Sequence, residues 1–387
     1  MVDRRLLVLV CAVVLVETLF FAALTPLLPE LSREFGLSKT GVGILSGAYA
    51  AGGTLGALCG AWLATRAGLR ATTVVGMVVL ATCCAGFGLA DHVWLLDSLR
   101  FAQGAGAAIA WTGGLAWLAA EAPPERRGEL LGIALGAAVT GALLGPLVGG
   151  AARLTGRPVA FASVAALGVV LAVWAARMPA PPPPVRQPLR LMLSSLRRAN
   201  VLSGVWLIAL PSLLFGCLTV LGPLSLDAVG VGALGMTIFW VVSAAAGAAQ
   251  SPLLGRWSDR RGRLEPVRAG LVASIAVSLT IPLADSRATL IALVLAASVF
   301  YNSFWVPGGA LLTEAAEAHG LEHGFSFALF NFSWAPAGAI GSIAGGWLAD
   351  VLGNGSSYLV LALTCGVTLL VITPRRVAIA CSDLVSE

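Results

Sequence analysis

The residues of this chain with the clearest chemical potential are charged side chains that interrupt long apolar runs. Glu17 follows about eleven apolar residues that begin at Leu6. Removing an unpaired carboxylate from water disfavours its charged form, so we expect Glu17 to be protonated or paired at neutral pH. This predicts a proton carrier or a contact for a cationic ligand. The alternative is a structural acid that is hydrogen-bonded among neighbouring helices.

Arg100 is the second such residue, and it begins the tract Arg100–Ala108, which also contains Gln103. An arginine inside an apolar segment costs a few kcal/mol or more, so it normally faces a cavity or a carboxylate. Asp97, one helical turn earlier, is a candidate partner for the guanidinium. Alternatively, Arg100 lies close enough to the membrane surface for its head group to reach water.

The elements that must position these residues are membrane-spanning helices. The chain is 58% hydrophobic and 11% charged, whereas soluble domains have about 25% charged residues. Apolar runs of about 20 residues, the length that spans a bilayer, recur from end to end. The net charge of +5 comes from arginines in short tracts between these runs, a pattern that argues against nucleic-acid binding. The first run, from Leu6 to Leu28, is too long for a signal peptide, and we expect it to be retained.

The pattern predicts an all-α membrane protein with twelve transmembrane helices in two pseudo-symmetric six-helix bundles. The N-terminal bundle is expected over residues 1–178, a cytoplasmic linker rich in Pro and Arg over 179–200, and the C-terminal bundle over 201–387. The distribution of basic residues places both termini in the cytoplasm. The predicted spans are residues 6–29, 41–64, 71–90, 93–120, 128–152, 158–178, 201–223, 232–254, 267–284, 288–313, 325–348 and 357–374.

The two halves also look like copies of each other, because three landmarks recur at nearly one offset. The offsets are 197, 194 and 196 residues (223 − 26, 260 − 66 and 341 − 145). An internal duplication holds one register across separated landmarks, and transporter folds with such repeats bind their substrate between them. The matching pairs are Leu24–Leu27 with Leu221–Leu224, Arg66–Gly68 with Arg260–Gly262, and Gly145–Gly150 with Gly341–Gly346.

A charged tract joins predicted helices 8 and 9 and contains Gly255, Asp259, Arg260, Gly262 and Arg263. The first glycine permits close helix contact, the aspartate can pair with an arginine or cap a helix, and the second glycine permits a tight turn. Such contacts can hold one side of a bundle shut. The alternative is a basic loop that simply obeys the positive-inside rule.

The matching tract of the first half has Thr65 at the position of the aspartate, followed by Arg66 and Gly68. Threonine can cap a helix but carries no charge. Either this gate is weaker than its counterpart, or another acid substitutes for the missing one.

Predicted helix 5 contains Gly141, Gly145, Pro146, Gly149 and Gly150. Small residues four apart let helices touch, and the proline bends the helix where neighbouring packing must accommodate the freed carbonyl. Ordinary packing between helices is the alternative explanation for this pattern.

Together these tracts resemble the signatures of the major facilitator superfamily. The charged tract resembles its loop signature GxxxDRxGR, although Thr65 departs from this signature in the first half. Helix 5 is similar to the antiporter signature GxxxGPxxGG, and Arg100–Ala108 is similar to RxxQGxG of proton-coupled members. The resemblance covers helices 1 to 5 and 7 to 11, and it implies a secondary transporter.

Within the superfamily, the chain looks most like the multidrug and amine proton-antiporter branch. Glu17 stands nine residues before Pro26, as the helix 1 aspartate of vesicular monoamine transporters stands before its proline. Further acids of those transporters fall by spacing on Asn302 and Asn331. An amide can bind substrate but cannot carry a proton. Proton coupling should therefore concentrate on Glu17, with Arg100 modulating it.

Aromatic side chains crowd predicted helices 10 and 11 and either line an apolar pocket or face lipid. We predict that Gln103, Asn302, Trp305 and Asn331 contribute to the substrate cavity, with the first half handling protons and the second mainly lining the substrate site. The aromatic set is Phe300, Tyr301, Phe304, Trp305, Phe325, Phe327, Phe330, Phe332 and Trp334.

The predicted function is proton-coupled efflux of a small organic compound, lipophilic or cationic, by alternating access in a bacterial cell membrane. The alternatives are a proton symporter or facilitator for a small nutrient or metabolite, and a non-transporting membrane sensor or scaffold. The sequence has no phosphate-binding loop and no nucleophile–base cluster, so we do not expect an enzyme. The seven cysteines and three histidines lack metal-ligand spacing, so we expect no metal or cofactor. We expect a monomer.

Overall fold

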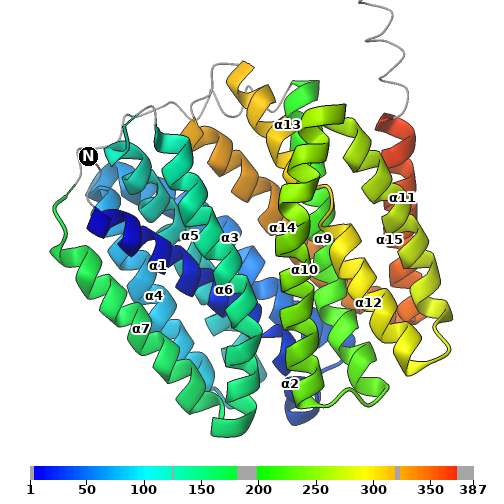
Figure 1. Ribbon diagram of the computed structural model, residues 1–387. Helices are drawn as coiled ribbons and strands as arrows, with labels where there is room; N and C mark the ends of the chain where they lie inside the picture. Colours follow the sequence, from blue (N-terminus) through cyan, green and yellow to red (C-terminus); the bar gives the residue numbers. More distant parts are fainter. Residues whose placement is uncertain (1–3, 124–125, 181–197, 319–322, 373–387) are drawn as a thin grey trace, which may run out of the picture.

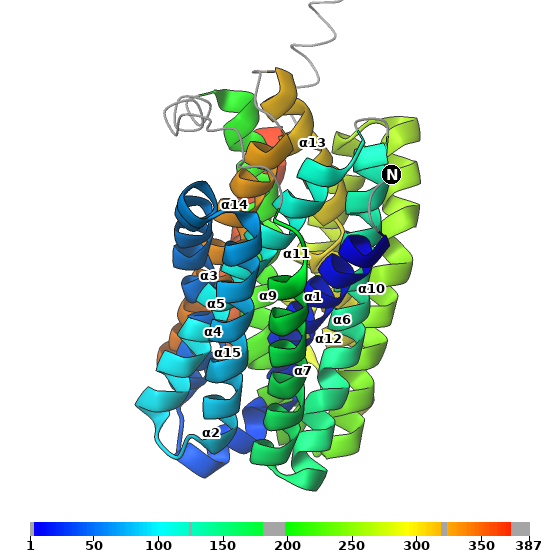
Figure 2. The same ribbon diagram turned by 90° about the vertical axis from the view of Figure 1, so that its left-hand side faces the viewer.

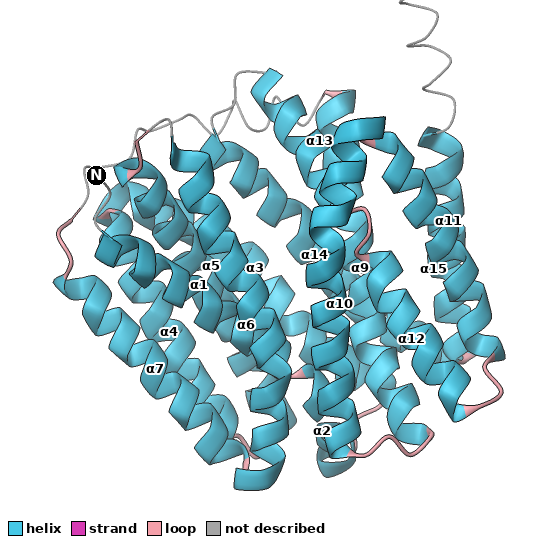
Figure 3. Ribbon diagram, in the orientation of Figure 1, coloured by secondary structure: helices cyan, strands magenta, loops and turns pink. Residues whose placement is uncertain are grey.

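The computed structural model describes residues 4–123, 126–180, 198–318 and 323–372, which are almost entirely helical (Figure 3). Helices suit this composition because a lipid environment leaves the backbone no partners except its own groups. The first half consists of α1 (Arg4–Ala23), η1 (Thr25–Leu27), α2 (Leu28–Phe35), α3 (Lys39–Ala67), α4 (Leu69–Leu89), α5 (Val93–Glu121), α6 (Arg127–Thr155) and α7 (Arg157–Arg177).

The second half repeats this pattern of long helices. Ten helical segments among the described residues are long and apolar enough to cross a membrane. The elements form twelve spans when α1–η1–α2, α11–η3 and α12–α13 each count as one, which confirms the predicted twelve-helix fold. The second half consists of α9 (Ala199–Ala228), α10 (Ala233–Arg261), α11 (Leu264–Thr280), η3 (Ile281–Leu283), α12 (Arg287–Tyr301), α13 (Trp305–Ala318), α14 (His323–Leu352) and α15 (Asn354–Ile372).

Two spans are interrupted where the sequence predicted continuous helices. The first span changes from an α-helix to a 3-10 turn around Pro26. It then continues as α2 to Phe35, six residues beyond the predicted end. The tenth breaks between α12 and α13. Pro307 has no N–H to donate to the carbonyl of Ser303, so the regular helical ladder cannot run through this point.

The charged tract is mostly helical, so its prediction as a loop was wrong. α10 continues to Arg261, seven residues past the predicted end, and only Gly262 and Arg263 separate it from α11. In the first half, Gly68 alone separates α3 from α4. Both glycines adopt a left-handed φ, 86° and 87°, which a glycine adopts at little cost.

The described ends of the chain lie on one face of the molecule. The start of α1 and the end of α15 lie at the top of Figure 1, whereas α2 and the connection between α9 and α10 lie at the bottom. The view from the side shows the same arrangement (Figure 2). We call these the terminal face and the distal face.

The duplication extends to the backbone. Six glycines have positive φ in the described part of the chain, and they fall into three pairs, one member in each half. Their offsets are 194, 194 and 197 residues (230 − 36, 262 − 68 and 353 − 156). Of these pairs, only the second was among the repeated landmarks identified in the sequence. The pairs are Gly36 with Gly230, Gly68 with Gly262, and Gly156 with Gly353.

The halves meet through small residues on α3 and α14 and on α6 and α10. A Cβ atom at Gly43 would lie 2.5 Å from the carbonyl oxygen of Ser342. A Cβ atom at Gly150 would lie 2.6 Å from Oγ1 of Thr237. The predicted linker over 179–200 falls largely outside the described residues, and α9 already begins at its end, so the domain boundaries stay a prediction.

Candidate proton and substrate site

Glu17 is buried among the helices of the first half, with 9% of its surface exposed. The hydroxyl of Tyr49 on α3 donates to Oε1 of Glu17 over 2.9 Å. The hydroxyl of Thr18 lies 3.0 Å from Oε2 and 2.9 Å from the carbonyl of Val14, and its one proton serves one acceptor at a time. The carboxylate therefore has neutral hydroxyl partners, an arrangement from which a proton can be gained or lost.

Arg100 lies beside this carboxylate and is 2% exposed, so it does not reach water. Its guanidinium donates to the carbonyls of Phe20 and Phe21, over 3.1 and 2.9 Å, just before the break in the first span. It also donates to Oε1 of Gln103 over 3.0 Å. The predicted pairing with Asp97 is wrong, because the structure gives the guanidinium these partners and leaves Oδ1 of Asp97 buried without a hydrogen bond.

Tyr49 connects the two charged residues, and sequence reasoning missed it. The guanidinium carbon of Arg100 lies 4.4 Å from the centroid of the Tyr49 ring, within the range of a cation–π interaction. The phenol therefore contacts the cation with its face and the carboxylate with its hydroxyl. One signal was available in the sequence: Tyr49 is the single tyrosine of the first half, in a helix otherwise rich in Gly and Ala.

Close backbone contact explains why Tyr49 and Arg100 meet. A Cβ atom at Gly104 would overlap the carbonyl oxygen of Tyr49, and a Cβ atom at Gly52 would overlap that of Phe101. Only glycine lets α3 and α5 approach this closely. The two helices therefore present their polar side chains to each other inside the bundle.

Gln103 is fully buried and holds Arg100 rather than lining an open space in this conformation. Its Nε2 donates to the carbonyl of Cys83 on α4 over 3.2 Å, while its oxygen accepts from the guanidinium. The orientation of the amide is fixed, because a carbonyl can only accept and an arginine can only donate.

The glycines of predicted helix 5 pack against the helix that carries Glu17. A Cβ atom at Gly141 would overlap the carbonyl of Leu15, and one at Gly145 would lie 2.5 Å from Cβ of Ala22. Gly149 makes the same close approach to Ala23. Pro146 is buried inside α6. Small residues thus fix α1 against α6 along a stretch from Leu15 to Ala23, which includes the carboxylate.

The predicted substrate residues of the second half lie on α14 (Asn331), in the break before α13 (Asn302) and at the first residue of α13 (Trp305). Asn302 is half-buried, and its Nδ2 donates to the carbonyl of Ser298 over 2.8 Å. Asn331 is half-buried, and its Oδ1 accepts from Nε1 of Trp334 over 2.9 Å. The rings of Trp305 and Phe330 pack edge to face, 5.1 Å apart.

The aromatic set divides by environment. Tyr301 and Phe304 are fully buried in the hydrophobic core. The side chains of Phe325 and Phe327 lie outside the described part of the chain. The partly buried members that pack on the smaller core of the second half are Trp305, Phe330, Phe332 and Trp334.

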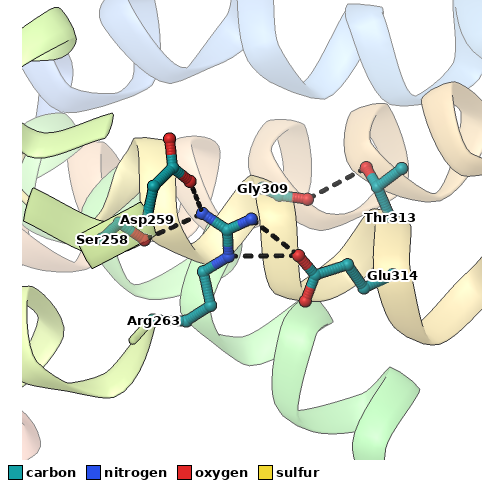
Figure 4. Close-up of polar contacts among 6 residues, drawn as sticks. All are labelled: Ser258, Asp259, Arg263, Gly309, Thr313 and Glu314. Carbon is teal, nitrogen blue, oxygen red and sulfur yellow. Dashed lines mark hydrogen bonds and ion pairs between the residues drawn. The ribbon is translucent and has the colours of Figure 1, made fainter. Parts of the chain in front are cut away.

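The charged tract of the second half forms an ion-pair cluster on the terminal face (Figure 4). Arg263 pairs with Asp259, donates to Oε1 of Glu314 over 2.8 Å, and donates to the hydroxyl of Ser258 over 3.2 Å. Glu314 on α13 was not predicted as a partner. A Cβ atom at Gly255 would meet its nearest atom at 3.9 Å, so close packing does not require glycine there in this conformation.

The matching tract of the first half has no carboxylate partner in the contacts that the structure shows. The hydroxyl of Thr65 donates to the carbonyl of Trp62 over 2.8 Å, within its own helix. The guanidinium of Arg66 lies 5.0 Å from the centre of the Trp62 ring. The two tracts therefore differ in charge, as their sequences indicate.

A second polar cluster, not predicted from the sequence, joins the halves at the distal face. The carboxylate of Asp350, at the end of α14, accepts from the backbone N–H groups of Lys39 and Thr40 over 3.1 and 2.7 Å, and from the Thr40 hydroxyl over 2.6 Å. We call these contacts the distal latch. It includes the bond from Nζ of Lys39 to Asn354, 2.7 Å long. Nearby, Arg33 pairs with Asp227 across the halves at 2.5 Å.

Two pseudo-symmetric helical bundles around buried charges define a class of membrane protein, the secondary transporters built from repeats. The family model described as Major Facilitator Superfamily matches residues 10–286 and 225–379. The chain therefore belongs to the major facilitator superfamily of transporters.

Solved structures and curated relatives agree with this assignment. The fold is similar to a bacterial homologue of the human lysosomal transporter Spinster in an inward-facing, occupied conformation, with a TM-score of 0.77, 15% identity and 94% of each chain covered. It is also similar to the xylose transporter XylE from E. coli in a partially occluded inward-open conformation, with a TM-score of 0.74, 16% identity, and 95% of this chain and 97% of that chain covered. An uncharacterized MFS-type transporter, YcaD of Salmonella typhimurium, is 30% identical over 128 residues. That match spans 33% of this chain and 33% of the relative.

Proposed function

We propose that this protein exports a small organic compound in exchange for protons, with Glu17 as the proton carrier. The observation that carries the proposal is a buried carboxylate that accepts a hydrogen bond from Tyr49, with the Arg100 guanidinium stacked on the same phenol. A carboxylate in this setting can gain or lose its proton without breaking an ion pair. An ionisable side chain inside a membrane span commonly marks a proton relay or an ion pathway.

The conformation supports an alternating-access cycle. The distal latch and the Arg33–Asp227 pair close the distal face across the halves. The charged cluster of the terminal face is formed within the second half. If both termini lie in the cytoplasm of a bacterium, this state is closed to the outside of the cell. Substrate then binds from the cytoplasm, and protons enter from the other side after the halves rock.

The antiporter branch remains the proposed place of this chain within the superfamily. The glycines of α6 pack directly on α1, which carries Glu17. Asn302 and Asn331 are amides that bond to neighbouring groups and cannot carry protons. Coupling through one carboxylate predicts a simple exchange in which protonation of Glu17 favours one conformation and substrate favours the other.

The test of this proposal is pH-gradient-driven efflux from proteoliposomes. A broad compound screen in a drug-sensitive host first identifies a transported compound. Glu17→Gln should then abolish gradient-driven efflux while the protein stays folded, because the amide cannot release a proton. Glu129→Gln is the matched control, since Glu129 is an exposed acid paired with Arg126 on the terminal face. Unchanged efflux in Glu17→Gln would refute the proposed role.

Proton symport of a nutrient or metabolite is the second candidate. It rests on the similarity of the fold to XylE, and fold alone does not fix the direction of transport. The two candidates predict opposite proton movements when substrate is added to vesicles. Substrate moving against the protons identifies export, and substrate moving with them identifies symport.

A further inference from the structure

We propose that Trp334 is a positioning residue that links the proton site of the first half to Asn331 of the second half. The inference deepens the proposed function, because it rests on Glu17 as the group that changes charge. It adds a route by which that change is sensed across the interface between the halves. Trp334 is not a charged residue and is absent from the signatures discussed above.

The route consists of four consecutive contacts. The hydroxyl of Tyr49 binds Glu17, and the Tyr49 ring packs on Phe21 with 5.3 Å between centroids. Phe21 then packs edge to face on Trp334 of the other half, 6.1 Å away. The indole N–H of Trp334 donates to Asn331. The Glu17 carboxylate is therefore connected to the Asn331 amide by a continuous series of contacts.

The position of the Phe21–Trp334 contact makes it sensitive to the conformation of the transporter. Contacts between α14 and the first half begin at Asp350 on the distal face and continue past Gly338, which lies against Ala50. Trp334 contacts Phe21 further along α14 towards the terminal face. The contact thus lies towards the inner end of the closed distal region, where rocking of the halves must alter it.

The two rings differ in how freely they can respond. Tyr49 is 2% exposed, and Arg100 lies against its ring, so the phenol cannot follow the carboxylate without disturbing its neighbours. Two thiols on α4 also lie near this cluster: Cys84, within electrostatic range of Tyr49 and Arg100, and its neighbour Cys83, whose carbonyl accepts from Gln103. Trp334 is only half-buried and has room to move.

The hydrogen bond at the end of the route has one possible direction. An indole N–H can only donate, so the oxygen of Asn331 must be the acceptor. While this bond stands, it uses one of the two lone pairs of the amide oxygen and holds that oxygen towards the indole, which leaves the amide N–H groups as the better-placed contacts for a ligand. Release of Trp334 would free this lone pair and let the amide turn its oxygen towards a substrate that carries an N–H or O–H group.

Tryptophan fluorescence of the purified protein in lipid nanodiscs tests the route without a substrate. The fluorescence should change between about pH 5 and about pH 9, the range in which buried carboxyls can titrate. The protein has eleven tryptophans, and Trp334→Phe should remove most of the pH-dependent change in their fluorescence. Glu17→Gln should remove it by fixing the charge, and Tyr49→Phe should reduce it because the ring remains while the hydroxyl bond is lost.

The matched control is Trp240→Phe. Trp240 also packs edge to face on a phenylalanine, Phe239, and its indole N–H is buried without a partner, so its loss should leave the pH-dependent change intact. Size-exclusion profiles and melting temperatures show whether each variant is folded. A change that persists in Trp334→Phe, or in Glu17→Gln, would overturn the proposal, as would fluorescence that is independent of pH. Failure of efflux to depend on Glu17 is a separate outcome, measured in proteoliposomes.

Discussion

Replacing Asp350 by asparagine should weaken the distal latch and shift the transporter towards a distal-open state. The carboxylate holds the first turn of α3 through two backbone N–H groups and one hydroxyl. Asparagine keeps one acceptor oxygen but turns an N–H₂ group towards the remaining donors. The loss therefore acts on an interface that must open in every transport cycle.

The size of the effect follows from these three bonds. Hydrogen bonds to a charged group contribute about 1.5–3 kcal/mol each when buried. Asp350 is exposed, so solvent screening reduces the total loss to about 1–3 kcal/mol. Because about 1.4 kcal/mol corresponds to a factor of ten, the ratio of distal-closed to distal-open molecules should fall by about five-fold to a hundred-fold.

Hydrogen–deuterium exchange of the protein in nanodiscs measures this shift. Asp350→Asn should raise exchange at the first turn of α3 and the end of α14, and lower it at the terminal ends of α10 and α13, which approach the first half when the distal face opens. Asp285→Asn is the control, since Asp285 is exposed in the connection before α12. Faster exchange at the distal face alone would indicate local fraying and would contradict the two-state reasoning. Unchanged exchange would show that the latch is not holding the halves.

Three further substitutions test the packing and charge of the site. Gly104→Ala should destabilise the protein by about 1–3 kcal/mol through overpacking against Tyr49, whereas Gly132→Ala, in open space on α6, should be neutral or stabilising in a thermal melt. Arg100→Lys should lower gradient-driven efflux at least tenfold, because an ammonium group cannot bind the carbonyls of Phe20 and Phe21 and the amide of Gln103 at once as the planar guanidinium does. Full activity would show that positive charge alone suffices. Glu314→Gln should lower the free energy of unfolding by at most about 1 kcal/mol, because Glu314 is exposed and its partner Arg263 is partly exposed.

Much of the fold could be predicted because it follows from local composition. Apolar runs of bilayer length fix the number of helices, and repeated landmarks fix the relation between the halves. The prediction missed the break that precedes Pro307, because a proline inside an apolar run does not reveal whether neighbouring packing keeps the helix continuous. The prediction also ended α10 too early. Charged residues lower the local hydropathy and so end a predicted membrane span, although the helix itself can continue through them.

The site was only partly predictable for a different reason. Glu17 and Arg100 are identifiable because an isolated charge in an apolar run is unusual. Their partners depend on which helices touch, and that depends on Gly52 and Gly104 bringing α3 against α5. Tyr49 and the carbonyl partners of Arg100 could therefore not be deduced from spacing along one helix, and Asp97 was the wrong choice for the same reason.

The central claim is that Glu17 carries the proton of an exchange cycle. The most direct measurement compares two reactions of Glu17→Gln in the same proteoliposomes: net efflux driven by a pH gradient, and exchange of labelled for unlabelled substrate without a gradient. The account predicts that net efflux is lost while exchange continues, because the amide can still accept from Tyr49 and permits substrate-bound rocking. Net efflux at the rate of the unmodified protein would contradict it.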